Sequence, residues 1–360
     1  MADVMGEYFD DWHLISPAVV TGPSVWGVPA TTPGTGSAAA IYALRHTIKT
    51  GRPAGGSGAL TDAVRASFEA AGGRTRTSSR VDRLLVRDGA VSGVRLTDGT
   101  SIGAEVVVAA CDPHRVFLEW LDAVPPRARR LVDTWRTAPV RDGYESKIDA
   151  VLTSLPTSSA ASTLHELRPG ADVLGPTTIV APSPDDTAEA HGLRGRGLVH
   201  ERPGLLVNIP TAIDPDMMIA PDEHVLSLEV LFTPYDHPGG WSESPEPKRW
   251  LGLLDELYEP DTLRIDRWRA MTPDRYETEF SMHRGHTPAY AASPLVALLG
   301  SRRDTTRYRT PISGLYLSGA ATFPGAGVFG APGRNAADAV MRDLRGSRPT
   351  TWWRRHRPAA

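Results

Sequence analysis

Cysteine, lysine and long apolar runs are all scarce in this sequence of 360 residues. Cys111 is the single cysteine, which excludes an internal disulfide framework and a thiolate-rich zinc site. Such usage is typical of a reducing intracellular compartment, and we expect a cytoplasmic protein. Lysine occurs only at Lys49, Lys147 and Lys248, so arginine supplies nearly all of the positive charge.

Signals for membranes and for nucleic acids are also weak. No apolar run approaches the roughly 18 residues that a helix needs to span a bilayer. The N-terminal residues are acidic and lack the apolar core of a signal peptide. A formal net charge of −3 argues against a general nucleic-acid binder, so we expect no nucleic-acid partner. With 41% hydrophobic residues, the chain can bury one large core or two moderate ones, as a soluble globular protein does.

The most informative segment is rich in glycine and lies near the C-terminus. Gly325, Gly327 and Gly330 follow the GxGxxG pattern, between a predicted strand at 315–317 and a predicted helix. Glycine lets backbone N–H groups approach an anion or an aromatic ring closely, and a following helix offers its positive N-terminal end. The alternative is a tight strand-to-helix turn that needs glycine only for packing.

This motif stands in an unusual place for a dinucleotide fingerprint. The fingerprint belongs to the first βαβ unit, and a second strand and an acidic residue follow it within about 20 positions. Here only a predicted helix over 336–344 and a tail rich in proline and arginine follow. A GxGxxA sequence at 34–39 comes after proline-rich sequence instead of a buried strand. We therefore expect the motif at 325–330 to close a cofactor site rather than to open one.

Two helices are predicted in the first quarter of the chain. Residues 1–36 are rich in proline and glycine and are expected to be irregular, and Ser37 then caps a helix that runs to about residue 49. A second helix is predicted over 60–71, where Gly72 and Gly73 end it. The apolar positions expected on the inner faces of these helices are Ile41, Leu44 and Ile48, and Leu60, Val64 and Phe68.

Four strands are predicted next. Two Asp-Gly turns separate the strands at 80–87, 91–96 and 101–102, and this pattern is typical of hairpins. Residues 104–110 form a short, almost wholly apolar run, which suits a strand buried on both faces of a parallel sheet. A helix, a β-meander and a buried parallel strand in this order indicate the later part of a nucleotide-binding domain.

The middle of the chain has a different texture. Apolar strands at 205–209 and 224–232 are separated by long loops, and an amphipathic helix is predicted over 247–258. We therefore expect a fold of class α/β plus α+β, with a partial Rossmann-like domain and an inserted mixed-sheet substrate domain. The predicted boundaries are 1–54 (irregular and helical N-terminal segment), 55–112 with 311–346 (partial nucleotide-binding domain), 113–310 (substrate domain) and 347–360 (basic aromatic tail).

Residues 314–320 and 324–337 together resemble the C-terminal flavin-contacting motif of the phytoene-desaturase-like family of FAD-dependent oxidoreductases. The match is close to the branch of pyridine-nucleotide-disulfide-oxidoreductase-like proteins. Residues 55–63 are similar to the GGMGxLxxAL stretch of the family, and residues 81–113 to its strand block ending in AxxVVxxxxP. The resemblance covers nearly the whole chain, and further matching segments of the substrate domain are 210–215 and 232–235.

This resemblance implies an FAD cofactor and particular contacts with it. The backbone of Val81 would meet the adenine. The residues that would line the isoalloxazine and the pyrophosphate are Gly319, Ala320, Gly325, Gly327, Val328 and Gly330. The implied chemistry is hydride transfer from a hydrophobic small molecule to the flavin, in which the cofactor supplies the reactivity, so no catalytic acid or base is nominated. The sequence departs from the family in one respect, because it has no opening strand–GxGxxG–helix–strand–Glu unit to hold the ADP half of FAD.

Two functional hypotheses therefore stay open. The first is an FAD-dependent oxidoreductase of the desaturase or dehydrogenase type. The second is a truncated, non-redox member that works as a binding or scaffold protein, or as one half of a split flavoenzyme. A sheet without its first unit has an open edge, which a homo-oligomer or a complementing chain would cover. The tail at 351–360 suits peripheral contact with an anionic membrane, and a plain disordered tail is the alternative.

Three weaker signals each have a simpler explanation. Residues 55–59 nearly match the GxSxG nucleophile elbow but do not follow a strand, so a helix cap at Ser57 is favoured. His283 and His286 have a spacing that metal ligands use, but no nearby carboxylate or thiolate completes a site, and we expect a solvated loop and no metal. Lys147 lies on a predicted strand, where a surface salt bridge is favoured over a place near a flavin.

Overall fold

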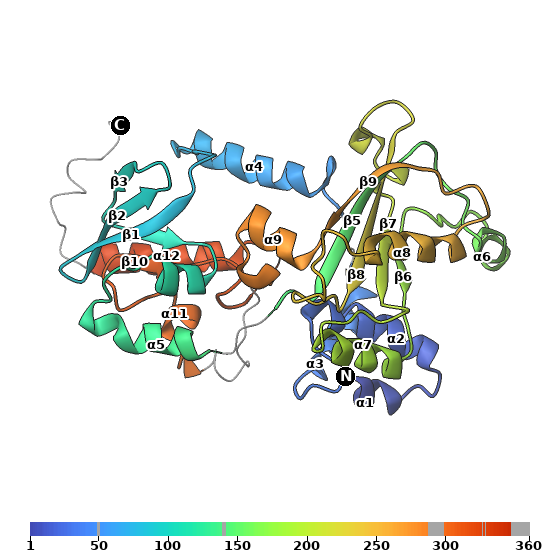
Figure 1. Cartoon of the computed structure of the whole chain (residues 1–360), viewed down its shortest axis with the longest axis horizontal. Helices are drawn as coiled ribbons and strands as arrows, with labels where there is room; N and C mark the ends of the chain where they lie inside the picture. The colour runs from blue at the N-terminus through green and yellow to red at the C-terminus, as the bar shows by residue number, and fades with distance from the viewer. Residues whose placement is uncertain (49–50, 139–141, 287–298, 326, 328, 347–360) are drawn as a thin grey trace. The chain divides into compact units, whose positions relative to one another are not determined.

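The computed structural model describes residues 1–48, 51–138, 142–286, 299–325, 327 and 329–346 (Figure 1). The chain forms two compact units. Unit 1 comprises Met1–Thr75 and Arg141–His286, and unit 2 comprises Arg76–Val140 and Thr287–Ala360. These units cut the chain at other points than the predicted domain boundaries, because the helix after residue 55 groups with unit 1 and the residues after 113 group with unit 2. The predicted tail at 347–360 lies outside the described residues.

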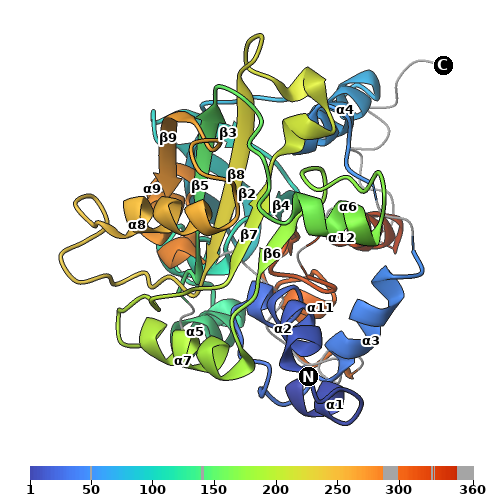
Figure 2. The same cartoon turned by 90° about the vertical axis from the view of Figure 1, so that its right-hand side faces the viewer.

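Unit 1 is built on a five-stranded antiparallel sheet (Figure 2). Its strand order is β6-β7-β8-β5-β9. The strands are β5 (Glu145–Leu152), β6 (Thr178–Val180), β7 (Leu205–Asn208), β8 (His224–Leu231) and β9 (Ile265–Met271). The long central strands β5 and β8 pair over their whole length, from Glu145 opposite Leu231 to Leu152 opposite His224.

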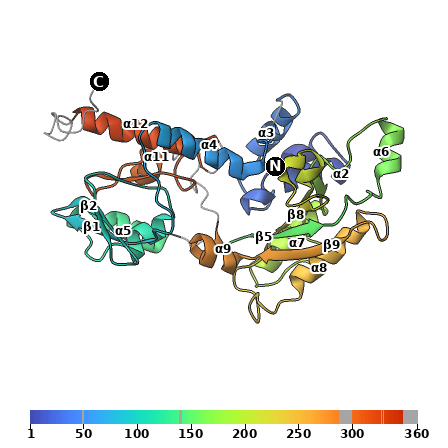
Figure 3. The same ribbon diagram turned by 90° about the horizontal axis from the view of Figure 1, so that it is seen from above.

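One face of this sheet carries the main hydrophobic core. Leu226, Leu228 and Val230 alternate along β8 and are fully buried, which confirms the apolar strand predicted at 224–232. They pack with Trp250 and Leu254, which come from α8 (Glu246–Gly252) and the short turn Leu253–Glu256 that continues it. The helix predicted over 247–258 is thus confirmed, although its second half tightens into a 3₁₀ turn. Figure 3 shows α8 along the strands of this sheet.

The opposite face of the sheet is covered at one end by helices. Val20 of α2 (Trp12–Val20) and Ala190 of α7 (Pro184–Arg194) pack against Leu206 and Leu231. Helix α1 (Ala2–Gly6) packs on α2 through Met5 and Ile15. The prediction that residues 1–36 are irregular was therefore wrong. Pro17 lies inside α2, and burial of its apolar face outweighs the helix-breaking residue. The other short helices of unit 1 are α6 (Ala161–Leu167) and α9 (Pro273–Phe280).

The two predicted N-terminal helices exist, but their predicted inner faces are not buried. Helix α3 spans Ser37–Arg45 and α4 spans Gly56–Ala70. Neither Ser37 nor Ser57 is an N-cap, because each lies inside its helix after a glycine. Gly72 N–H donates to the Glu69 carbonyl and ends α4 as predicted. The predicted core positions that are instead exposed are Ile41, Leu44, Ile48, Val64 and Phe68.

Unit 2 contains two small sheets. The predicted meander is confirmed as β1 (Val81–Arg87), β2 (Ala90–Leu96) and β3 (Ser101–Gly103). The predicted parallel strand is confirmed as β4 (Val107–Ala109), and its partner is β10 (Leu315–Leu317). The prediction that it is buried on both faces was wrong, because Val108 is 45% exposed. Leu84, Leu315 and Leu317 belong to the core that joins both sheets. The α-helices among the described residues of this unit are α5 (Arg129–Thr137), α11 (Arg303–Thr306) and α12 (Ala331–Gly346).

Membrane-spanning helices were sought in the described part of the chain. No helix there is long and apolar enough to cross a bilayer.

Candidate functional site

The two parallel strands of unit 2 end side by side. Leu317 pairs with Ala109, and the N–H of Ser318 donates to the carbonyl of Ala109 at 2.9 Å. Gly319 follows with a φ of +78°, and a Cβ at this position would lie 3.1 Å from the carbonyl oxygen of Ala110. A side chain at this position would therefore be strained, and glycine avoids that strain. Ligands of parallel α/β sheets bind at this carboxyl edge, so the strand ends define a candidate site.

A short chain of hydrogen bonds fixes the loop from β10 to α12. The hydroxyl of Tyr308 donates to the carbonyl of Phe323 at 2.6 Å, and the side-chain amide of Asn335 donates to the same hydroxyl at 2.8 Å. Thr322 is fully buried, and its hydroxyl donates to the carbonyl of Gly319. Because these partners come from three segments of unit 2, the loop is preorganised by its own unit.

Three glycines of the loop hold backbone conformations that other residues rarely adopt. The φ angles of Gly325, Gly327 and Gly330 are +107°, +156° and +64°. Open space surrounds the Cα of Gly330, and no atom lies within 4 Å of the Cβ that another residue would carry. Helix α12 begins at the next residue, and the N–H groups of Ala331 and Gly333 at its start have no carbonyl partner inside the helix. The exposed Arg334 adds a cation in that first turn. The arrangement suits an anion or the polar edge of a ring.

The turn after β4 closes the same edge of the sheet. Asp112 is buried, and its carboxylate accepts from the N–H of His114 at 2.8 Å and contacts its ring Nδ1 at 2.9 Å. The neighbouring Cys111 packs against the unit 2 core. Burial, and next the charge of Asp112, raise the pKa of the Cys111 thiol to about 11. This thiol is therefore a packing group and a poor nucleophile.

The predicted cofactor contacts all belong to unit 2, but they fall in two places. Gly319 and Ala320 follow β10, and Gly325, Gly327 and Gly330 lie in the loop before α12. Val81 begins β1 in the meander, where it pairs with Leu96. Val328 lies outside the described residues. The glycine positions thus form one continuous loop, whereas Val81 belongs to a separate sheet.

Unit 1 has a cavity of about 1100 Å³ over the polar end of its sheet. The start of α4 forms one wall, because the N–H of Gly55 donates to the carboxylate of Asp214 at 2.7 Å. Arg52 anchors the preceding residues by donating to Asn208 at 2.7 Å and to Thr177 at 2.9 Å. Further residues that line the cavity come from the strands and from the loop after β7: Lys147, Asp149, Val225, Ser227, Ile213 and Met217.

The charged groups on this face of the sheet neutralise one another. The ammonium of Lys147 pairs with Asp149, which also accepts from Arg269 at 3.2 Å. The predicted salt bridge of Lys147 is thus confirmed, although its side chain also lines the cavity and is 39% exposed. On the neighbouring strand β8, Glu229 lies directly opposite Lys147 of β5. Burial raises the pKa of the Glu229 carboxyl.

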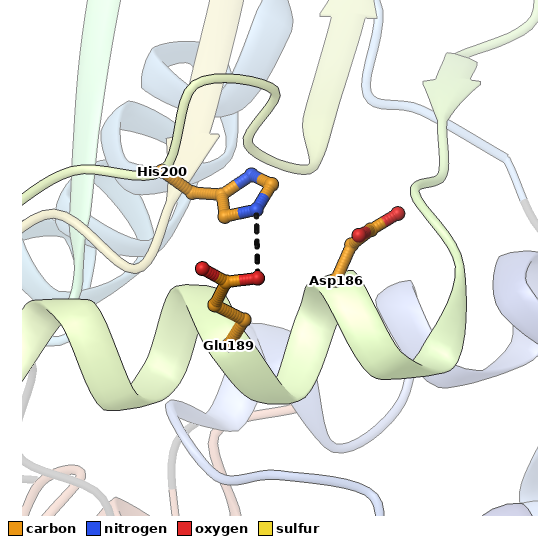
Figure 4. Close-up of side chains that lie close together, drawn as sticks. All are labelled: Asp186, Glu189 and His200. Atoms are coloured by element: carbon orange, nitrogen blue, oxygen red, sulfur yellow. Dashed lines mark ion pairs between the residues drawn. The ribbon is translucent and has the colours of Figure 1, made fainter.

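A possible metal cluster lies elsewhere in unit 1. Figure 4 shows Asp186 and Glu189 on α7 and His200 on the loop that follows. One ligand atom from each lies within 4.8 Å of the others. However, Ser183 donates to Asp186 at the start of α7, and Glu189 pairs with His200 at 3.8 Å. These contacts explain the cluster as helix capping and a surface ion pair.

The predicted histidine pair lies near the end of unit 1. His283 begins a single 3₁₀ turn after α9 and His286 follows it, and both are half-buried, unlike the solvated loop predicted. Neither belongs to a group of three metal-ligating side chains within the part of the chain that the structure describes.

Sequence patterns missed the cavity as a whole because its residues come from segments far apart in the chain. Lys147 and the segments around residues 55–59 and 210–215 were singled out separately, but no local spacing shows that they meet. The Asp186 cluster is local to α7 and the loop after it, and its acids resemble an ordinary exposed helix face.

Comparisons with known proteins bear on these sites. No family model matches the chain. A mouse protein described as pyridine nucleotide-disulfide oxidoreductase domain-containing protein 2 is 32% identical over 309 residues, which are 81% of this chain and 51% of that protein. A lycopene-forming phytoene desaturase from Pseudescherichia vulneris is 26% identical, over 94% of this chain and 65% of the desaturase. The chain thus spans about half the length of the first of these relatives.

A solved oxidoreductase structure from Methanosarcina mazei matches 81% of this chain and 55% of its own, with 16% identity and a TM-score of 0.48. The sequence relatives, the glycine loop that follows a parallel strand pair, and the mixed helices and sheets agree with one another. The relatives, a pyridine nucleotide-disulfide oxidoreductase domain protein and phytoene desaturases, support a place in the phytoene-desaturase-like family of FAD-dependent oxidoreductases.

Proposed function

We propose that the chain functions as an FAD-dependent oxidoreductase that removes a hydride from a hydrophobic small molecule. The observation that carries the proposal is the joining of the β4–β10 strand ends to α12 through a glycine loop braced by its own unit. A Cβ at Gly319 would crowd the strand end, and the side of Gly330 is open. This loop fits a flat, partly anionic group, and we infer a Rossmann-like arrangement around it.

Particular residues would hold the cofactor. Gly319, Ala320 and the loop at 325–330 would line the isoalloxazine and the pyrophosphate. The first turn of α12 and Arg334 would favour the phosphates, because both present positive charge. Val81 would meet the adenine through its backbone. Bound FAD would supply the hydride acceptor, and the residues of this chain would orient it and exclude water.

The cavity of unit 1 is the proposed place of the substrate. Ile213, Met217 and Val225 give it apolar walls, and Lys147 and Asp149 in its lining pair with each other. The apolar walls favour a largely hydrophobic molecule. The Pseudescherichia vulneris relative is named a lycopene-forming phytoene desaturase, and this name agrees with a hydrophobic substrate.

The visible spectrum of the purified chain, with and without added FAD, tests the proposal. We expect flavin bands at close to one FAD per chain. Gly330→Val should weaken FAD binding by about tenfold or more, because a side chain fills the open side of the loop. Gly99→Val is the matched control, since it has a φ of +85°, open space and a place in the same unit. A colourless wild-type chain that takes up no FAD would refute the proposal.

A second function keeps the fold without tight FAD binding. The chain would then be a binding or scaffold protein, or one half of a split flavoenzyme. Among the described residues, the parallel sheet has two strands, and Val108 of β4 is 45% exposed. A sheet edge of this kind favours a covering partner. Light scattering over a range of concentrations tests for self-association, and a monomer that binds FAD tightly would exclude this alternative.

A further inference from the structure

We propose that a surface pocket of unit 2, separate from the glycine loop, binds a small molecule that carries a diphosphate group. The pocket has a volume of about 640 Å³, which lies within the usual range of ligand sites. It lies among α5, α11 and the segment before β10, and none of the described residues of the glycine loop lines it. Among the described residues, its charged lining is five arginines and one acid: Arg127, Arg130, Arg302, Arg303, Arg309 and Asp304.

The single acid, Asp304, already has an ion-pair partner. The side chain of Asp304 is 3% exposed, and its carboxylate accepts from Arg302 at 3.0 Å and from the indole N–H of Trp135 at 3.0 Å. The guanidinium of Arg302 also lies 4.9 Å from the centre of the Trp135 ring. These contacts fix Arg302 at the wall of the pocket and leave the carboxylate no charge to offer elsewhere.

Arg309 is neutralised by a second acid outside the pocket. Its guanidinium donates twice to Asp343, at 2.8 Å each. For Arg127, Arg130 and Arg303, no ion pair forms within the residues that the structure describes. Among the described residues, three guanidinium charges at the pocket therefore have no ion-pair partner.

Two of these arginines stand where a cation is least favourable. Arg130 lies in the first turn of α5, and Arg127 lies in the 3₁₀ turn Pro126–Ala128 that leads into it. The start of a helix is its positive end, so these side chains add to a positive potential instead of cancelling it. An anion in the pocket would be attracted by the helix end and by the arginines together.

The chemistry of guanidinium selects the ligand. Its planar fork binds phosphate oxygens through two parallel hydrogen bonds, and three free forks match the charge of two linked phosphates better than that of one. The pocket is also larger than a single phosphate needs. Pyrophosphate is the simplest probe of such a site.

Calorimetric titration of the full chain with sodium pyrophosphate tests this site. We expect saturable binding at low salt that is at least tenfold tighter than the binding of orthophosphate. The triple variant Arg127→Gln, Arg130→Gln, Arg303→Gln should lose at least tenfold in affinity and keep its circular dichroism spectrum, since the three side chains are exposed. Arg136→Gln, at the other end of α5 and paired with Asp133, should bind as the wild type does.

The glycine loop could bind pyrophosphate by itself, and Gly330→Val separates the two sites. Pyrophosphate binding should survive this substitution even where FAD binding is lost. Three results would overturn the proposal: no saturable binding by the wild type, unchanged binding by the triple variant, or equal affinity for orthophosphate. Loss of binding in Arg136→Gln would equally refute it, since it would show a general charge effect.

Discussion

The two units carry opposite charge. Unit 1 holds 18 Lys and Arg residues against 31 Asp and Glu residues, a formal charge of −13. Unit 2 holds 21 against 11, a formal charge of +10. The net charge of −3 hides this difference. The glycine loop, the start of α12 and the arginine pocket all lie in the basic unit, so this is the part of the chain suited to phosphate-bearing ligands.

The units also differ in their cores, and a substitution in the core of unit 1 should have the largest effect on the free energy of unfolding. Trp250 is fully buried against the sheet. Trp250→Ala should lower the free energy of unfolding by about 3–5 kcal/mol, through lost burial and a cavity. Urea unfolding followed by circular dichroism measures it. Trp268→Ala is the control, because this side chain on β9 is 43% exposed and should cost less than about 1 kcal/mol. Equal losses would show that Trp250 is not a core anchor.

Cys111 reports on unit 2 in the same way. Its pKa of about 11, against an ordinary value of 9.0, should slow alkylation by iodoacetamide at pH 8 about 100-fold relative to the unfolded chain. Mass spectrometry follows the reaction without ambiguity, since no other cysteine is present. The protection should persist in Trp250→Ala in the absence of urea, because Cys111 packs in the core of the other unit. Native and unfolded rates within threefold of each other would contradict the assigned burial.

A glycine substitution tests the junction of the two sheets in unit 2. Gly314 has a φ of +78°, and a Cβ there would lie 2.3 Å from the carbonyl oxygen of Glu105. Gly314→Ala should cost about 1–3 kcal/mol from backbone strain, plus the contact with Glu105. Gly89→Ala is the matched control, with a φ of +77° and open space. Urea unfolding should rank Gly314→Ala as the more destabilised, and the opposite order would refute the role of the contact.

Local patterns predicted the parts of both units that depend on neighbouring residues. The alternation of Leu226, Leu228 and Val230 marked a strand with one buried face, and the Asp-Gly pairs marked the meander. The strand and helix that flank the glycine loop were also predicted, because a short apolar run and glycine punctuation suffice to mark them. These features are encoded within about ten residues each.

Features that depend on distant segments escaped prediction. Periodicity aligned Val64 with Phe68 on α4 and Ile41 with Leu44 on α3, but it does not tell whether another element covers that face. The helix α2 was missed because Pro17 and the nearby glycines suggested an irregular chain. The cavity of unit 1 and the arginine pocket of unit 2 are assembled from separate segments, so only the folded structure brings their residues together.

Two acids with opposite pKa shifts give the smallest and most direct contrast between the units. In unit 2, the Arg309 guanidinium holds the pKa of the Asp343 carboxyl below its usual value, and the hydroxyl of Tyr316 assists. In unit 1, burial holds the pKa of the Glu229 carboxyl above its usual value. A lowered pKa contributes stability above about pH 4 that is lost as the pH falls through the folded value. A raised pKa has the opposite effect, and its contribution is lost as the pH rises.

Asp343→Asn should therefore destabilise the chain at pH 7, by less than about 1 kcal/mol because the side chain of Asp343 is 40% exposed. Glu229→Gln should stabilise it at pH 7, because the neutral amide avoids the cost of a buried charge. The difference for Glu229→Gln should shrink first, as the pH falls through the raised pKa of Glu229 toward its ordinary value of 4.5, and the difference for Asp343→Asn should shrink only below about pH 3.8, the ordinary pKa of Asp343. Urea unfolding at pH 7, 5 and 3.5 measures both curves. Shifts of the same sign at pH 7 would show that the two carboxyls do not differ in environment as their contacts require.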